Sequence, residues 1–150
     1  MKKIIFALTI FIFTMNNPII SHAAQIPSTT QQLFHEKTVL ENGITMEYEL
    51  TVSPSNTRSN SKTATKTATC KVDGKVVATI KLSADFTYTG SSATCTRASS
   101  SYSMSAGWSY SNRTTTRSGN TAKTSAKISK NNEYFNTNVT MTCSGSGEIS

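Results

Sequence analysis

Apolar and polar residues alternate with a period of two along most of the chain. The clearest example is residues 75–88, where mostly polar residues separate Val76, Ala78, Ile80, Leu82, Ala84, Phe86 and Tyr88. Successive side chains of a strand point to opposite faces, so this pattern predicts a strand with one face in a core and the other in water. Similar alternation recurs between Ile44 and Cys143, and no stretch has the period of a helix.

Short segments typical of tight turns separate the alternating stretches about every ten residues. These segments are Asn42-Gly43, Asp73-Gly74, Thr89–Ser92, Ser118–Asn120 and Asn131-Asn132. Repeated turns with no helical segment predict an all-β fold, namely an antiparallel two-layer β-sandwich of about 6–8 strands, immunoglobulin-like in appearance. We expect this domain to occupy residues 43–150.

The turn at Asp73-Gly74 allows two registers. A two-residue loop alone would place the apolar face of one strand beside the polar face of the next. A three-residue loop, or a bulge beside the turn, instead pairs Val72 with Val76 and Cys70 with Ala78. We expect the second arrangement.

Large side chains alternate with small ones in residues 101–110, after a short strand expected around residues 93–97. The apolar and aromatic positions are Tyr102, Met104, Ala106, Trp108 and Tyr110. We expect them to face inward from one strand and to form the thickest part of the core. The tail at residues 144–150 is too small and polar to predict a further strand.

The first 24 residues have the organisation of a signal peptide. Lys2 and Lys3 precede an apolar run at residues 4–13, and Ser21–Ala24 ends in small residues. The run is shorter than the about 20 residues needed to span a bilayer, although a retained membrane anchor is the alternative. We expect cleavage after Ala23 or Ala24 and a soluble, secreted (extracellular) protein with no membrane span. Residues 25–42 show no clear period and are predicted to be a flexible lead-in.

The chain is basic, with a net charge of +7 that falls to about +5 once Lys2 and Lys3 are removed. The basic residues are spread along the predicted strands and turns; those taken as binding candidates are Lys75, Lys81, Lys123 and Lys127. A mild attraction to polyanions follows, whether wall polymer, anionic lipid or nucleic acid, and an ordinary solvated surface is the alternative. Several exposed aromatics over a basic groove would indicate oligonucleotide binding, and none are visible, so we expect no specific nucleic acid.

The residues offer little for catalysis or for a metal. After cleavage the only histidine is His35, which lies in the lead-in, and one histidine without clustered thiols does not make a usual zinc site. Glu47 and Glu49 share a strand face about 7 Å apart, a spacing compatible with paired carboxylates. Such a pair on an exposed face is more often a solvated edge. We expect no enzyme activity and no cofactor.

Binding is the function class that the residues favour. Two rows of hydroxyls could contact a carbohydrate but are also ordinary filler of exposed strands, namely Thr63, Thr65, Thr67 and Thr69, and Ser101, Ser103, Ser105 and Ser109. Tyr134 is the main aromatic in outward phase. We expect a monomer that binds a surface, possible partners being an anionic cell-wall polymer or an extracellular protein. The alternative is an inhibitor, toxin or immunity-type protein that uses the loop at residues 53–61.

Three cysteines in a secreted chain suggest one disulfide and one free thiol. Cys70 lies in the middle of a predicted strand, as a buried thiol would, whereas Cys95 and Cys143 lie near strand ends. We expect a Cys95–Cys143 bridge, which would stabilise the fold by about 4 kcal/mol; pairing of Cys70 with either partner is the alternative. The order Cys95, Trp108, Cys143 resembles that of immunoglobulin domains, but Met141 occupies the place of their conserved tyrosine, which favours convergence.

A second resemblance covers about residues 44–150. It is carried by three segments and one tryptophan, namely residues 86–95 (FTYTGSSATC), Trp108, residues 118–122 (SGNTA) and residues 139–143 (VTMTC). Together they resemble small, Ser/Thr-rich, uncharacterised proteins secreted by Gram-positive bacteria of the Firmicutes type. The resemblance implies a signal peptide, an all-β body and no established activity, and it supports the Cys95–Cys143 pairing.

Overall fold

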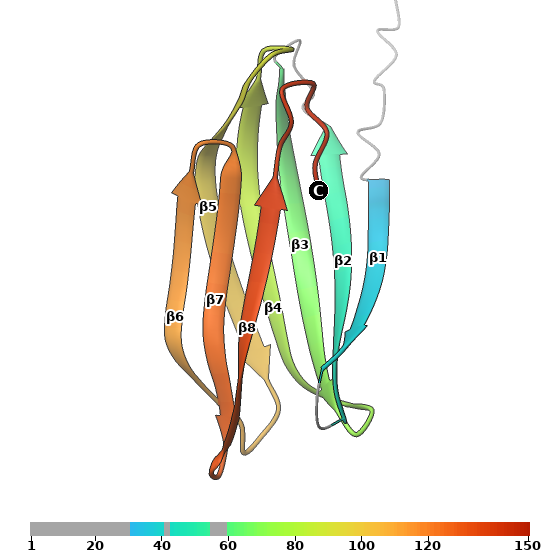
Figure 1. The fold of residues 1–150 in the computed structure, drawn as a ribbon, viewed down its shortest axis with the longest axis vertical. Coiled ribbons are helices and arrows are strands. Elements are labelled where there is room, and N and C mark those ends of the chain that lie inside the picture. Colours follow the sequence, from blue (N-terminus) through green and yellow to red (C-terminus); the bar gives the residue numbers. More distant parts are fainter. Residues whose placement is uncertain (1–30, 41–42, 55–59) are drawn as a thin grey trace, which may run out of the picture.

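The computed structural model describes residues 31–40, 43–54 and 60–150, and these residues form eight β-strands (Figure 1). The predicted signal peptide, residues 25–30 and Asn42 lie outside the described residues. The strands are β1 (Gln31–Val39), β2 (Ile44–Pro54), β3 (Ser61–Val72), β4 (Lys75–Tyr88), β5 (Ala93–Met104), β6 (Ser109–Ser118), β7 (Thr121–Lys130) and β8 (Glu133–Thr142).

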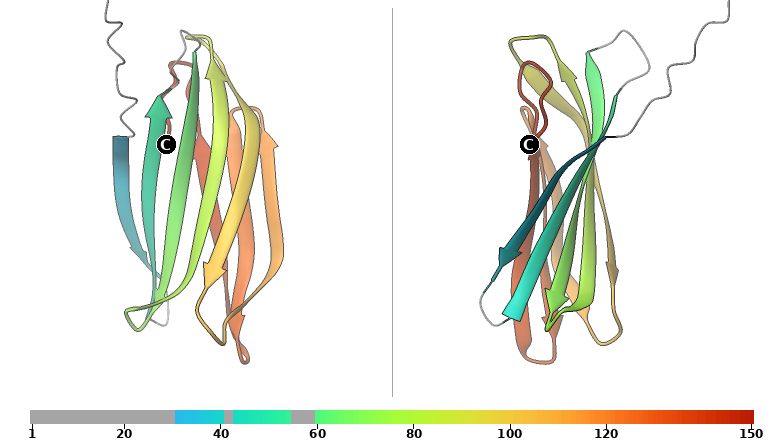
Figure 2. Two further views of the ribbon diagram at one scale, coloured as in Figure 1. Left: turned by 180° about the vertical axis from the view of Figure 1, so that it is seen from behind. Right: turned by 90° about the vertical axis from the view of Figure 1, so that its right-hand side faces the viewer.

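The strands form two antiparallel sheets that face each other (Figure 2). One sheet has the order β1-β2-β3-β4-β5 and the other the order β6-β7-β8. The predicted all-β sandwich is therefore confirmed. Within each sheet every strand pairs only with its neighbours in sequence, so the topology is a meander rather than the Greek key of immunoglobulin domains.

The core lies between the sheets and follows the predicted alternation. The largest fully buried side chains come from β2, β4, β7 and β8; they are Met46, Leu50, Ile80, Leu82, Phe86, Ile128, Val139 and Met141. Buried alanines such as Ala68, Ala84 and Ala122 fill the space between them. Burial of this apolar surface is the main stabilising contribution to a sandwich of this kind.

The register at the Asp73-Gly74 turn combines the two arrangements considered from the sequence. Cys70 pairs with Ala78, as predicted, and a bulge follows directly after this pair. The expected pairing of Val72 with Val76 is wrong, because Val72 pairs with Lys75 across a two-residue turn. Both turn residues have positive φ angles, as a tight hairpin turn requires. The bulge then restores the register of the two apolar faces.

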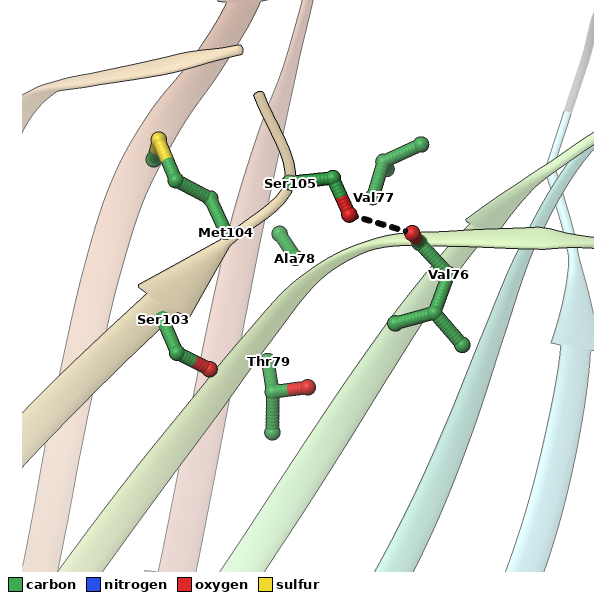
Figure 3. Close-up of a pocket in the computed structure, with 7 residues that line it drawn as sticks. All are labelled: Val76, Val77, Ala78, Thr79, Ser103, Met104 and Ser105. Carbon is green, nitrogen blue, oxygen red and sulfur yellow. Dashed lines mark hydrogen bonds between the residues drawn. The ribbon is translucent and has the colours of Figure 1, made fainter. Parts of the chain in front are cut away.

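The bulge also reverses the predicted orientation of two valines. Val76 was expected to face the core, but its side chain is 47% exposed, whereas Val77 is buried. The Ser105 hydroxyl donates a hydrogen bond to the Val76 carbonyl at 2.8 Å, as Figure 3 shows. These residues line a hollow of about 190 Å³ beside Thr79, Ser103 and Met104. The hollow has neither a charged side chain nor an aromatic ring in its lining.

The strand predicted over residues 101–110 is divided by a turn. Strand β5 continues from Ala93 to Met104, and β6 begins at Ser109. Between them Gly107 has a φ of 84°, and the Trp108 amide donates to the Ser105 carbonyl. Tyr102, Trp108 and Tyr110 pack against the core but stay half-buried, so the prediction that they form its thickest part is wrong. The alternation continues through the turn, which is why the sequence pattern does not reveal it.

The prediction of a lead-in without regular structure is also wrong for part of the segment. Residues Gln31–Val39 form the edge strand β1, which pairs with β2. Side chains 35–40 of this segment are exposed, with Val39 70% exposed. Exposed side chains have no reason to alternate, so the backbone pairing of residues 35–39 leaves no signal in the sequence.

The C-terminal tail covers one end of the sandwich. It folds back after β8, with the Thr142 and Ser150 backbones exchanging two hydrogen bonds, and Ile149 is buried in the core. Gly145 packs against the turn between β4 and β5, and Gly147 packs against the Tyr88 ring. Lys62 donates a hydrogen bond from its ammonium to the Gly147 carbonyl. The small residues of the tail permit this close approach.

The close packing of the tail predicts that adding a single methyl group at Gly145 destabilises the fold. A Cβ atom at Gly145 would lie 2.5 Å from the Ser91 carbonyl carbon, and backbone atoms cannot move aside as a side chain would. We therefore expect Gly145→Ala to lower the free energy of unfolding by about 1–3 kcal/mol. Urea denaturation measures this change. The exposed Glu148→Ala is the control, and an equal effect of both variants would contradict the close packing.

Replacing two buried threonines, Thr124 and Thr137, by valine should have different effects on the free energy of unfolding. The Thr124 hydroxyl donates to the Thr114 carbonyl at 2.8 Å and lies 2.5 Å from the Tyr102 hydroxyl. The buried Thr137 hydroxyl has no hydrogen-bond partner among the residues that the structure describes. Thr124→Val should cost about 1–2 kcal/mol, because it leaves polar partners unsatisfied. Thr137→Val should be neutral or stabilising. Thermal and urea unfolding of the two variants compare them directly, and equal losses would refute this account.

Candidate binding surface

The outer face of the β6–β8 sheet is polar and contains no acidic side chain. The residues of this face follow from the alternation of side chains along each strand and from the strand pairing. They are Ser109, Ser111, Thr114, Thr116 and Ser118 from β6, Thr121, Lys123, Ser125, Lys127 and Ser129 from β7, and Tyr134, Asn136, Asn138, Thr140 and Thr142 from β8. In Figure 1 this sheet lies in front of the larger one. We call this set of residues the basic face.

The two lysines of the basic face lie on its central strand. Lys123 is exposed between Thr116 and Thr140, and Lys127 follows four residues later, about 13 Å along the strand. The Lys127 ammonium lies 3.7 Å from the centre of the Tyr134 ring, a cation–π contact that brings these two groups together. Tyr134 is 61% exposed, as the sequence predicted.

The structure therefore brings Lys123, Lys127 and Tyr134 together and separates them from the other two candidates. Lys81 lies on the outer face of the larger sheet, and Lys75 lies beside the β3–β4 turn. The outer face of the larger sheet is mixed in charge, because Lys71 contacts Glu47 at 2.6 Å and Arg97 contacts Asp85 at 2.7 Å. The electrostatic potential of that face is therefore not uniformly positive, so the face is a less favourable surface for a polyanion.

Several hydroxyls of the predicted rows form hydrogen bonds within their own sheet. The Thr63 hydroxyl donates to Asp85 at 2.8 Å, and the Thr65 and Ser83 hydroxyls share a hydrogen bond. Ser105 and Ser109 likewise bond to the Val76 carbonyl and to Ser129. These contacts support their role as polar filler of exposed strands.

Of the two neighbouring carboxylates of β2, Glu47 forms an ion pair with Lys71. The hydrogen bond from Lys71 lowers the pKa of Glu47, so this carboxylate is ionised at neutral pH. Glu49 lies opposite the exposed His35 of β1 in the sheet. Among the residues that the structure describes, no group of three or more His, Cys, Asp or Glu side chains is placed to hold a metal ion.

A groove opens at the end of the sandwich opposite the C-terminal tail. It has a volume of about 460 Å³, and its lining joins both sheets: Ile44, Val72 and Asp73 from one, and Trp108, Asn132, Glu133, Tyr134 and Phe135 from the other. The Trp108 and Phe135 rings meet edge to face, with centres 6.0 Å apart. The sequence analysis did not predict this groove, because residues from four separate segments form it.

All three cysteines are buried free thiols, so the predicted Cys95–Cys143 bridge is not formed in this structure. The two residues nevertheless flank one turn, because the Cys95 and Cys143 amides donate to the carbonyls of Gly119 and Asn120. Burial raises the pKa of both thiols, and the neighbouring Cys95 raises that of Cys143 further. Cys70 lies elsewhere, beside Tyr110, and burial raises its pKa to about 12.

No helix of the described residues is long and apolar enough to cross a membrane. Comparison of the chain with protein-family models, with curated proteins and with solved structures gives no match in any of the three. The resemblance to small secreted Gram-positive proteins stays a prediction, and arguments about function rest on the residues themselves.

Proposed function

We propose that this protein is a secreted, non-enzymatic β-sandwich that binds an anionic cell-wall polymer through its basic face. The observation that carries the proposal is the grouping of Lys123, Lys127 and Tyr134 on a sheet face without an acidic side chain. Repeated negative charges of a polymer meet two ammonium groups along one strand. The surrounding hydroxyl and amide side chains supply hydrogen bonds to its other polar groups.

The strand geometry suits an extended ligand better than a compact one. The outer face of a short sheet is open, so a polymer chain is able to lie across the three strands without being enclosed. Contacts of this kind are mainly electrostatic and are screened over about 8 Å at physiological ionic strength. The resulting binding is weak for one site and depends on salt.

Export and oxidation complete the proposal. The predicted signal peptide would deliver the chain to an oxidising compartment, where Cys95 and Cys143 pair across the turn that they flank. Two S–H bonds break and one S–S bond forms, and the two electrons and two protons pass to a disulfide oxidant. The bridge would join the larger sheet to the end of β8 and so fix the two layers together.

The alternative of an inhibitor, toxin or immunity-type protein depended on the loop at residues 53–61. Residues 55–59 of this loop lie outside the described residues, and no other observation favours that alternative. We therefore develop the polymer-binding proposal alone.

The basic face predicts which lysines matter. Lys123→Gln with Lys127→Gln should weaken sedimentation with purified cell-wall fragments about tenfold at low salt, because these variants remove both cations of the face. Raising the salt concentration should weaken binding of the unmodified protein in the same way.

Lys75→Gln with Lys81→Gln is the matched control, since it removes the same net charge from elsewhere. Its binding should change little. Equal losses in both double variants would show that net charge alone attracts the protein, and salt-independent binding would contradict the proposal altogether.

The proposed bridge predicts how many cysteines react with a thiol reagent. Protein secreted into an oxidising medium, unfolded without reductant and treated with iodoacetamide, should be labelled at Cys70 alone, while reduced protein should be labelled at three sites. Labelling in the native state should be slow for every thiol, because burial raises their pKa values and so suppresses the reactive thiolate. Three labels without reduction, or a linked peptide containing Cys70, would overturn the proposed bridge.

A further inference from the structure

We propose that the groove at the open end of the sandwich binds an N-acetylhexosamine unit of a glycan. The inference rests on the proposed function in one respect, because the glycan is taken to be part of the same cell-wall polymer that the basic face contacts. The groove supplies a second kind of contact, one that recognises a neutral sugar ring rather than an anion.

The size and lining of the groove suit a small polar ligand with an apolar side. Its volume of about 460 Å³ lies within the about 300–1,000 Å³ typical of small-molecule sites. The Trp108 and Phe135 rings offer the apolar surface against which the C–H groups of a pyranose pack. Ile44 and Val72 form an aliphatic wall that fits the methyl group of an acetamido substituent.

The rim of the groove carries two carboxylates, which accept hydrogen bonds, and one amide side chain. The carboxylates of Asp73 and Glu133 accept hydrogen bonds from sugar hydroxyls, and the Asn132 amide both donates and accepts. The three side chains are exposed at turns, so ligand binding does not require them to be buried without partners.

Charge argues against a cationic ligand. The Lys130 ammonium lies 5.7 Å from the centre of the Trp108 ring, and Lys127 lies over Tyr134. The chain's own lysines therefore occupy the cation–π positions that an organic cation would need. An anion would in turn meet Asp73 and Glu133, so a neutral ring is the ligand that both sets of charges tolerate.

Tyr134 connects the groove to the basic face. Its neighbour Phe135 points inward against Trp108, while Tyr134 lies on the outer face beside Lys127. A glycan that carries anionic groups is able to pass from the lysines over Tyr134 to the rim of the groove. The proposal thus predicts one continuous binding path around the beginning of β8.

The test uses Trp108, the only tryptophan of the chain, as a fluorescent reporter. Titration with the N-acetylglucosamine tetramer should shift its emission at millimolar concentrations, equally at low and at high salt because the ligand is neutral. Asn132→Ala and Glu133→Ala should each weaken this binding about tenfold, because each removes a hydrogen bond to the ligand. Glu148→Ala, exposed on the C-terminal tail at the opposite end of the sandwich, is the control.

The two proposals fail separately. Lys123→Gln with Lys127→Gln should leave the tetramer titration unchanged while it weakens binding to wall fragments. No emission shift with the tetramer, or a shift that Asn132→Ala and Glu133→Ala leave unchanged, would overturn the sugar site even if wall binding persists. Unfolding curves of each variant distinguish a lost contact from a lost fold.

Discussion

The requirement that two sheets hide one face each from water determines most of this structure. Apart from Ile149 of the tail, the large buried side chains of the described residues lie at inward positions of strands, and mostly polar residues lie between them. Since side chains alternate strictly, a slip by one residue in any strand would expose its apolar set. The bulge after Cys70 shows how strictly the constraint acts, because a tight two-residue turn is retained and the register is corrected beside it.

The same constraint explains which parts of the fold were predictable. Strands β2, β3, β4, β7 and β8 were predicted because one face of each is buried and the other is not. Strand β1 was missed because side chains 35–40 are exposed, so this part of the strand shows pairing with β2 but no apolar alternation. The turn after Met104 was missed because Ala106 and Gly107 continue the alternation that a strand would show. Outward candidates on one strand, such as Lys123 and Lys127, could be paired from the sequence, whereas the groove needs the sheet pairing and the approach of four segments.

The two ends of the sandwich differ in a way that assigns them different roles. At one end the tail with Gly145 and Gly147 lies directly on the β4–β5 turn and the Tyr88 ring, and Ile149 fills the core. At the other end Trp108 and Phe135 meet only edge to face, and an open volume remains between the sheets. Close packing at the covered end holds the layers at a fixed spacing, so the open end stays a groove without needing a tight contact of its own. If the proposed sugar site is correct, one end of the long axis serves stability and the other serves recognition.

The meander has a consequence for how the chain acquires its structure. Each strand pairs only with the strand before or after it in sequence, so every hairpin is complete as soon as its second strand is available. A chain that emerges from its N-terminal end, during synthesis or during the proposed export, is able to add strands in order, without waiting for a distant partner. Pairings between neighbours in sequence also close short loops, which favours rapid formation compared with Greek-key sandwiches. Only the final step, in which β6–β8 and the tail close over β3 and β4, needs the whole chain, so the exposed inner face of the first sheet is the state most vulnerable to aggregation during folding.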